Sequence, residues 1–285
     1  MNKNNLKLAV QKNGRLTENT LGFLRASGLE FESYSRKLFS ACRNMPVEIL
    51  YVRDDDIPRL VESGAVDLGI LGQNILNEER PKVKKLLNLR YGYCSLALSV
   101  PKESPINDIS GLNGKTIATS YPRSTQQFFQ KYGVKVETIT IKGSVEIAPS
   151  LGLAAAIVDL VSTGSTLAMN DLRLLTPIYR SEAVLIANEK LGADTEKNPV
   201  LRQLITRFTS VLSAKNYKYI SLTVPDTSAP RLTKLLPNLV MTALPGQRLS
   251  VNGVIKEDMF WTVFDRMKDL GAKNIYMLPV EKIIS

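Results

Sequence analysis

The 285-residue chain predicts an α/β protein with two doubly wound lobes and a separate C-terminal βαββαβ domain. Short apolar strand segments alternate with helical segments over most of the chain, a pattern typical of parallel sheets covered by helices. A polar stretch at residues 104–114 divides this pattern into two runs. From Tyr217 onward the order of elements changes, which indicates another domain.

The first lobe is expected to begin with a strand and then a helix that ends at Gly28, because glycine is common just past the end of a helix. The second lobe repeats the alternation after the polar stretch. The expected strands of the two lobes are residues 6–10, 47–53, 65–71, 115–120, 136–141 and 156–161, and the expected helices are residues 17–28, 55–64, 124–133 and 198–214.

The last part of the chain has the order βαββαβ, which is the ferredoxin-like arrangement. Its expected strands are residues 217–224, 239–244, 249–255 and 274–281, and its expected helices are residues 228–236 and 258–271. We therefore expect a first lobe of residues 1–100 and 180–214, a second lobe of residues 101–179, and a C-terminal domain of residues 215–285.

The composition indicates a cytoplasmic protein with anionic partners. No apolar run approaches the ~18 residues of a membrane span, and the N-terminus lacks a signal-peptide pattern. Cys42 and Cys94 are too few for a disulfide framework or a zinc site. The net charge of +10 favours phosphorylated metabolites. Without a basic block interleaved with aromatic residues, we expect neither nucleic acid nor membrane as a partner.

Histidine is absent from the sequence. This absence excludes Ser-His and Cys-His nucleophile pairs, histidine general bases and most zinc sites. Any chemistry must therefore depend on carboxylates, Lys, Arg, hydroxyls, backbone amides or a bound metal.

A turn of small residues follows an apolar strand at residues 156–161. This turn consists of Ser162, Thr163, Gly164, Ser165 and Thr166. Backbone amides at the start of a helix bind phosphate well, and the hydroxyls add donors. The alternative is an ordinary polar helix cap, since Ser and Thr are favoured there.

Two carboxylates accompany the turn. Asp159 lies inside the strand and Glu146 precedes it. A buried carboxylate needs a cation or hydrogen-bond donors. The hydroxyls of a sugar beside a bound phosphate would supply donors, and a structural ion pair is the alternative.

The segment EIAPSLGLAAAIVDLVSTGSTL, residues 146–167, resembles the signature of the ATP phosphoribosyltransferase family. The positions that match are Glu146, Gly152, Ala154, Ile157, Asp159, Leu160, Thr163, Gly164, Thr166 and Leu167. The resemblance extends to LAVQKNGRL, GKTIATSYP and the C-terminal stretch from Asp258. It implies the long form, with lobes of periplasmic-binding-protein type II architecture and an ACT-like C-terminal domain.

The resemblance implies transfer of phosphoribose from PRPP (5-phosphoribosyl pyrophosphate) to N1 of ATP, the first step of histidine biosynthesis. Glu146 and Asp159 would be the catalytic carboxylates, and Asp159 with residues 162–166 would bind PRPP. Mg²⁺ would act mainly through the pyrophosphate. Adenine N1 is unprotonated at neutral pH, so that no strong base is required.

Cations are expected opposite the turn. Lys12 and Arg15 follow the first strand, on the side of the sheet where ligands bind in such folds. The candidates for contacts with ATP or pyrophosphate are Lys12, Arg15, Arg53, Asp67, Cys94 and Tyr121. Asp67 is expected to face adenine or a lysine, and Cys94 and Tyr121 either line the cleft or only pack. The run Asp54, Asp55, Asp56 is either a helix start or a metal site.

The C-terminal domain resembles the regulatory module that binds L-histidine and inhibits long-form enzymes. The resemblance implies Asp226, Leu239, Thr242 and Ala272 as histidine contacts. It also implies a homo-oligomer, in dimer and hexamer forms, and AMP as a further ligand.

Two other classes remain open from the lobes alone. A solute-binding protein, or the effector-binding part of a regulator, has the same two-lobe pattern. A nucleotide-binding regulatory module is the third class. The lack of an export signal, the 22-position motif and the ferredoxin-like tail favour the transferase.

Overall fold

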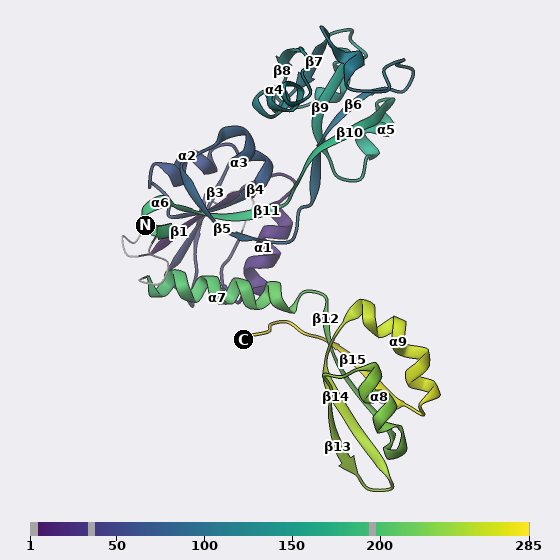
Figure 1. The fold of residues 1–285 in the computed structure, drawn as a ribbon. Coiled ribbons are helices and arrows are strands. Elements are labelled where there is room, and N and C mark those ends of the chain that lie inside the picture. The colour runs from purple at the N-terminus through teal and green to yellow at the C-terminus, as the bar shows by residue number, and fades with distance from the viewer. Residues whose placement is uncertain (1–4, 34–37, 194–197, 285) are drawn as a thin grey trace. The chain divides into compact units, whose positions relative to one another are not determined.

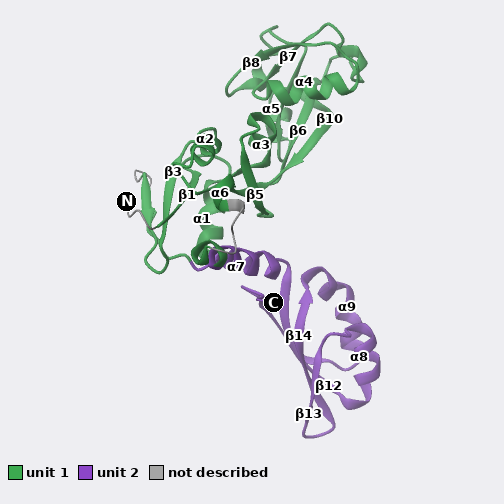
Figure 2. Cartoon of the chain, turned by 60° about the vertical axis from the view of Figure 1, so that its left-hand side comes forward, with its two compact units in different colours: residues 1–25, 29–202 green, residues 26–28, 203–285 purple. Residues whose placement is uncertain are grey.

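The computed structural model describes residues 5–33, 38–193 and 198–284. The chain forms two compact units, Met1–Arg25 with Leu29–Arg202 and Ala26–Gly28 with Gln203–Ser285 (Figure 2). The division falls within helix α7 (Pro199–Ala214). No helix among the described residues is long and apolar enough to cross a membrane.

The first lobe is built on a six-stranded sheet with the order β2-β3-β1-β4-β11-β5 (Figure 1). Its strands are β1 (Leu6–Gln11), β2 (Phe39–Ala41), β3 (Val47–Val52), β4 (Leu68–Gly72), β5 (Val83–Asn88) and β11 (Ala183–Asn188). Its helices are α1 (Thr17–Ala26), α2 (Ile57–Glu62), α3 (Gln73–Glu79) and α6 (Glu189–Ala193). Apolar side chains of α2 and the central strands pack into one core, so that the sheet is covered by helix as the sequence predicts.

The second lobe is built on a five-stranded sheet with the order β10-β6-β9-β7-β8. Its strands are β6 (Cys94–Pro101), β7 (Thr116–Thr119), β8 (Glu137–Thr140), β9 (Ala156–Val161) and β10 (Leu172–Ser181). Its helices are α4 (Pro122–Lys131) and α5 (Ser165–Met169), with 3-10 turns η1 (Ser110–Leu112) and η2 (Val145–Ile147). Phe128 and Phe129 of α4 fill the core against β6, β7 and β9.

Both sheets are mixed, although the alternation of elements predicts parallel sheets. Within the described residues, parallel pairing is confined to β3-β1-β4 and β8-β7-β9. β10 and β11 follow each other with Glu182 between them, and they pair antiparallel with β6 and with β4 and β5. β10 and β11 lie in different sheets, so the single residue between them carries the chain from the second lobe back to the first.

The C-terminal domain has the predicted βαββαβ order. Its elements are β12 (Tyr217–Pro225), η4 (Asp226–Ser228), α8 (Ala229–Leu235), β13 (Val240–Leu244), β14 (Arg248–Lys256), α9 (Glu257–Asp269) and β15 (Lys273–Pro279). The sheet order is β13-β14-β12-β15 and every neighbouring pair is antiparallel. Ile220, Leu222 and Val224 alternate along β12 and pack against Leu232 of α8 and Phe260 of α9. The ferredoxin-like prediction is confirmed.

Candidate functional site

The signature segment lies at the carboxyl end of β9. Asp159 is the fourth residue of β9 and is paired with Ala97 of β6. The turn that follows leads directly into α5. Gly164 occupies the cap position with φ of 81°, a left-handed conformation that favours glycine. The turn therefore depends on a residue without a side chain at its tightest point.

A cavity of about 220 Å³ lies between this turn and the two carboxylates. The predicted residues that line it are Arg15, Glu146, Asp159, Ser162, Thr163, Gly164, Ser165 and Thr166. Glu146 comes from η2, which precedes β9, while Arg15 comes from the turn after β1 in the first lobe. The structure thus brings together residues that the sequence predicts as a phosphoribosyl site.

Asp159 is held in an unfavourable environment for a charge. Its pKa is raised to about 6, mainly by burial and also by the negative charge of Glu146, while the N–H of Leu160 acts in the opposite direction. Among the described residues, no Lys or Arg forms an ion pair with either carboxylate. A structural ion pair does not account for these side chains, whereas ligand hydroxyls would supply the missing donors.

The hydroxyls of the turn form hydrogen bonds within the turn and with the neighbouring backbone. The Thr163 hydroxyl lies 3.0 Å from the Ser165 hydroxyl and 3.5 Å from the Ser165 nitrogen. Ser162 Oγ donates to the carbonyl of Tyr93 at 3.4 Å. Because the cap position belongs to Gly164, no Ser or Thr serves as the N-terminal cap of α5. The alternative of an ordinary polar cap is not supported.

The predicted cations follow the carboxyl ends of β1 and β3. Lys12 is the first residue after β1, and its N–H donates to the carbonyl of Val52 at 2.8 Å. Arg15 Nη1 donates to the carbonyl of Gly92, and this contact directs its guanidinium beside the cavity. Arg53 is exposed just beyond β3 and does not line the cavity. Of these three cations, Arg15 alone lines the cavity at Asp159.

The three aspartates after β3 line a second cavity of about 420 Å³ that also includes Tyr121. Asp56 is the cap residue of α2 but its side chain makes no cap bond. Among the described residues, no group of three His, Cys, Asp or Glu side chains could hold a metal ion. Asp54 has a different role, because its carboxylate accepts a hydrogen bond from Gln11 Nε2 at 3.0 Å. Its pKa is raised by burial and by the charge of Asp55.

Tyr121 lines one of the two cavities described above, whereas Cys94 lines neither. Tyr121 OH accepts a hydrogen bond from Asn74 Nδ2 at 3.2 Å, and burial together with the charge of Asp159 raises its pKa above the usual value. Cys94 is buried at the start of β6, and it lines neither the cavity at Asp159 nor the cavity at Tyr121. The packing alternative therefore fits Cys94 better.

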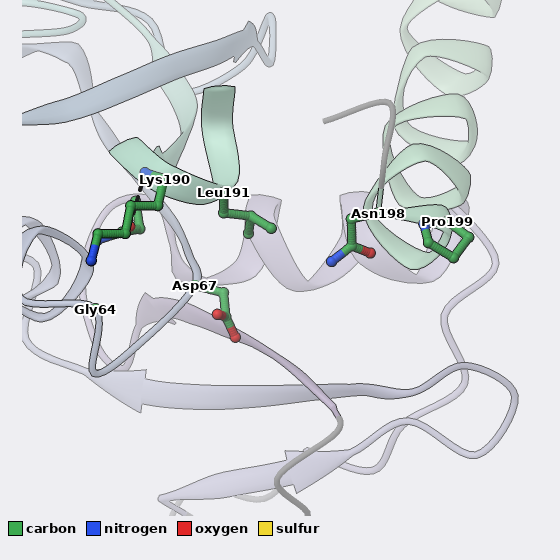
Figure 3. A pocket seen from close by; sticks show the side chains of 7 residues that line it. Gly64, Asp67, Lys190, Leu191, Asn198 and Pro199 are labelled. Carbon is green, nitrogen blue, oxygen red and sulfur yellow. Dashed lines mark hydrogen bonds between the residues drawn. The ribbon is translucent and has the colours of Figure 1, made fainter. Parts of the chain in front are cut away.

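Asp67 lies away from the other predicted residues. It precedes β4 by one residue, at the amino end of the strand, and its Oδ2 accepts from the N–H of Lys7 at 2.8 Å. It lines a separate cavity of about 490 Å³ with Lys190, Asn188 and Asn198 (Figure 3). Ligands of such sheets bind beyond the carboxyl ends of the strands. Asp67 therefore lies at the opposite end of its strand from the one where ligands of such sheets bind.

The four histidine candidates do not converge within one domain. Asp226 N donates to the carbonyl of Gln247 at 3.0 Å, and Ala272 follows Gly271, which packs against Pro225. The other two are Thr242, in the middle of β13, and Leu239, which packs on the core just before that strand. Asp226 and Ala272 thus lie at one end of the sheet, while Leu239 lies at the other end of β13.

Several buried or half-buried polar residues beside the site were not predicted from the sequence. Asn74 is buried and its Oδ1 accepts from Ser181 Oγ at 3.0 Å. Glu78 accepts from the N–H groups of Arg123 and Ser124 at 2.7 and 2.9 Å, and so caps α4 from the first lobe. Gln11 is a further example, because its hydrogen-bond partner Asp54 is 43 residues away in the sequence. The one feature of the sequence that could have indicated a role for Gln11 is its position at the end of an apolar strand.

Comparison with known proteins agrees with this geometry. The family model described as ATP phosphoribosyltransferase matches residues 53–210, and the model described as HisG, C-terminal domain, matches residues 214–282. The ATP phosphoribosyltransferase of Cytophaga hutchinsonii is 41% identical, with 98% of each chain covered. That of Parabacteroides distasonis is 40% identical, with 98% of this chain and 99% of the relative covered.

A solved structure is also similar. The ATP phosphoribosyl transferase (HisG:HisZ) complex from Thermotoga maritima has a TM-score of 0.61 and 29% identity, covering 72% of this chain and 98% of that chain. Family matches across both the lobes and the C-terminal domain exclude the solute-binding and regulator alternatives. The chain belongs to the ATP phosphoribosyltransferase family in its long form, and its activity is the transfer of the 5-phosphoribosyl group of PRPP to N1 of ATP, with release of pyrophosphate, in the first step of histidine biosynthesis.

Proposed function

We propose that the cavity at Asp159 binds the phosphoribosyl group of PRPP. The observation that carries this proposal is a pair of carboxylates beside a turn of small hydroxyl residues, neither of which forms an ion pair within the described part of the chain. The turn at residues 162–166 would hold the 5-phosphate through its amides and hydroxyls. Glu146 and Asp159 would accept hydrogen bonds from the ribose hydroxyls.

The reaction breaks the bond between the ribose anomeric carbon and pyrophosphate, which leaves with the electron pair. Positive charge develops on the ring, and the charges of Asp159 and Glu146 stabilise it. The lone pair of adenine N1 forms the new bond, and positioning of the two substrates supplies much of the rate. No protein group has to remove a proton in this step.

The anionic ends of the substrates call for cations. We assign Arg15 to the pyrophosphate of PRPP, because it lines the same cavity, and Lys12 and Arg53 to the phosphates of ATP. Mg²⁺ would enter as the complex with PRPP, held mainly by phosphate oxygens and water, as this ion prefers. AMP would compete at the ATP position, and the cytoplasm would supply both substrates.

A pyrophosphate-release assay tests this proposal directly. The purified full-length chain should release pyrophosphate only when PRPP, ATP and Mg²⁺ are all present. Release that is independent of ATP, or no release at all, would contradict the assignment of the cavity.

Gly164→Ala is expected to raise the KM for PRPP about tenfold while the KM for ATP stays unchanged. A left-handed conformation costs a residue with a Cβ about 1–2 kcal/mol, so the turn must change shape. The added Cβ itself meets no atom within 4 Å, so that the effect comes from the backbone. Steady-state kinetics with each substrate varied in turn measures both constants.

Gly133→Ala is the matched control. Gly133 lies in the same lobe at φ of 68°, also with nothing within 4 Å, but away from the turn. The control should lose similar stability and keep both KM values. An equal rise of the two KM values in Gly164→Ala would indicate collapse of the lobe instead of a damaged phosphate turn.

We propose that residues 1–100 with 180–214 and residues 101–179 are the two catalytic lobes, and that residues 215–285 form a regulatory domain that binds L-histidine. Asp226 would pair with the ammonium group of the amino acid, while Leu239, Thr242 and Ala272 would complete the site. Since these residues lie at different ends of one sheet, the site would be shared between copies in a dimer or hexamer.

Calorimetry on the intact chain should show heat of histidine binding, and the same concentrations should inhibit turnover. Inhibition requires tighter binding to the inactive state, where a tenfold preference corresponds to about 1.4 kcal/mol per site. Asp226→Asn should weaken histidine binding without changing turnover in its absence. If histidine gives neither heat nor inhibition, the regulatory assignment is wrong and the transferase assignment is unaffected.

A further inference from the structure

Gln11 is a buried polar side chain between two segments of the first lobe. It ends β1, is 7% exposed, and uses both ends of its amide. Its Oε1 accepts from the N–H of Leu16 at 3.0 Å, and its Nε2 donates to Asp54 Oδ2 at 3.0 Å. Gly14 packs directly on this amide, because a Cβ there would lie 2.4 Å from Nε2.

These bonds fix the turn between β1 and α1. The turn carries Lys12 and Arg15, and Gln11 ties its far end, at Leu16, to Asp54 beyond the neighbouring strand β3. We propose that Gln11 is a positioning residue for the transferase reaction, which holds Arg15 at the phosphoribosyl cavity through this turn. This inference rests on the proposed PRPP site.

Only a side chain with one donor and one acceptor satisfies both neighbours. Leu16 offers an N–H, so that the residue at position 11 must supply an acceptor for it. Asp54 offers its Oδ2 and therefore needs a donor. The other carboxylate oxygen of Asp54, Oδ1, already accepts from the Asp55 N–H at 3.1 Å. In Gln11→Glu an acceptor would face Asp54 Oδ2, and two carboxylates would repel each other at this distance. Adding Asp54→Asn reverses the donor and acceptor of the pair and satisfies every group again.

The test is a double-mutant cycle of Gln11→Glu, Asp54→Asn and the combined exchange, with KM for PRPP, kcat and Tm measured for each. Gln11→Glu is expected to raise the KM for PRPP about tenfold or more, with a smaller change in kcat, as expected when a charge-assisted bond is lost. The combined exchange should return KM to within about threefold of the unmodified chain.

Two results would overturn the inference. One is a KM for PRPP unchanged in Gln11→Glu. The other is a combined exchange that restores Tm but not KM, since the pair would then only stabilise the fold. Failure of the proposed PRPP site would look different, because the unmodified chain would itself show no PRPP-dependent release of pyrophosphate.

Discussion

Asp159→Asn is expected to lower kcat/KM by about 10²–10³-fold, the effect of removing one oriented group that acts on charge in the transition state. Asparagine has the same shape and keeps an oxygen for the Leu160 N–H, but it lacks the charge that would stabilise the ribose ring. Glu146→Gln should show a loss of the same kind. Steady-state kinetics with varied PRPP, together with melting curves, measures both effects.

The same substitution is expected to keep or raise Tm. The pKa of Asp159 is raised from 3.8 to about 6, mainly by burial. The stability that this shift contributes is therefore present below pH 3.8 and is lost as pH rises through about 6. At pH 7 the charge costs up to about 3 kcal/mol, at about 1.4 kcal/mol per pKa unit. A neutral side chain removes that cost.

Asp171→Asn is the control in the same lobe. Its carboxylate pairs with Lys102 at 3.1 Å and is 89% exposed, a surface pair with little effect on stability. Both kcat/KM and Tm should stay near the values of the unmodified chain. Near-normal turnover in Asp159→Asn, or a loss explained by a lower Tm, would contradict the catalytic assignment.

The parts of the site that the sequence predicts are local in the chain. Glu146, Asp159 and the turn to Thr166 belong to one continuous segment, so that a strand followed by a turn and a helix is enough to place them together. The ferredoxin-like domain is predicted for the same reason, since its order of elements is fixed by neighbouring segments. Arg15 could be placed opposite them because ligands of such folds bind beyond the carboxyl ends of the strands, and Arg15 follows β1 at that end of the first lobe's sheet.

The parts that the sequence does not predict depend on distant contacts. Gln11 and Asp54 are 43 residues apart, and Asn74 and Ser181 are 107 residues apart. No local pattern specifies such pairs. Asp67 falls outside β4, because this strand begins at Leu68, three residues later than the predicted start at residue 65. The apolar run also does not indicate which end of a strand faces the ligand.

The pH dependence of turnover should reflect the raised pKa of Asp159, to which the charge of Glu146 contributes. kcat/KM for PRPP is expected to fall below a pH of about 6, because protonation of Asp159 removes the charge that the transition state needs. One proton gives a decline of about tenfold per pH unit, or about 30-fold at pH 4.5. Rates between pH 4.5 and 8, with Tm at each pH, would show this limb.

Glu146→Gln distinguishes an ionisation of the protein from an ionisation of the substrate as the cause of this fall in rate. Phosphate groups also titrate near pH 6, but they are the same for both enzymes. The negative charge of Glu146 is one cause of the raised pKa of Asp159, so its removal should move the limb of the remaining activity to lower pH. Burial, the larger cause, stays in place, which should keep the limb above pH 3.8. If the two limbs coincide, the ionisation belongs to PRPP, and Asp159 does not carry the charge that controls turnover.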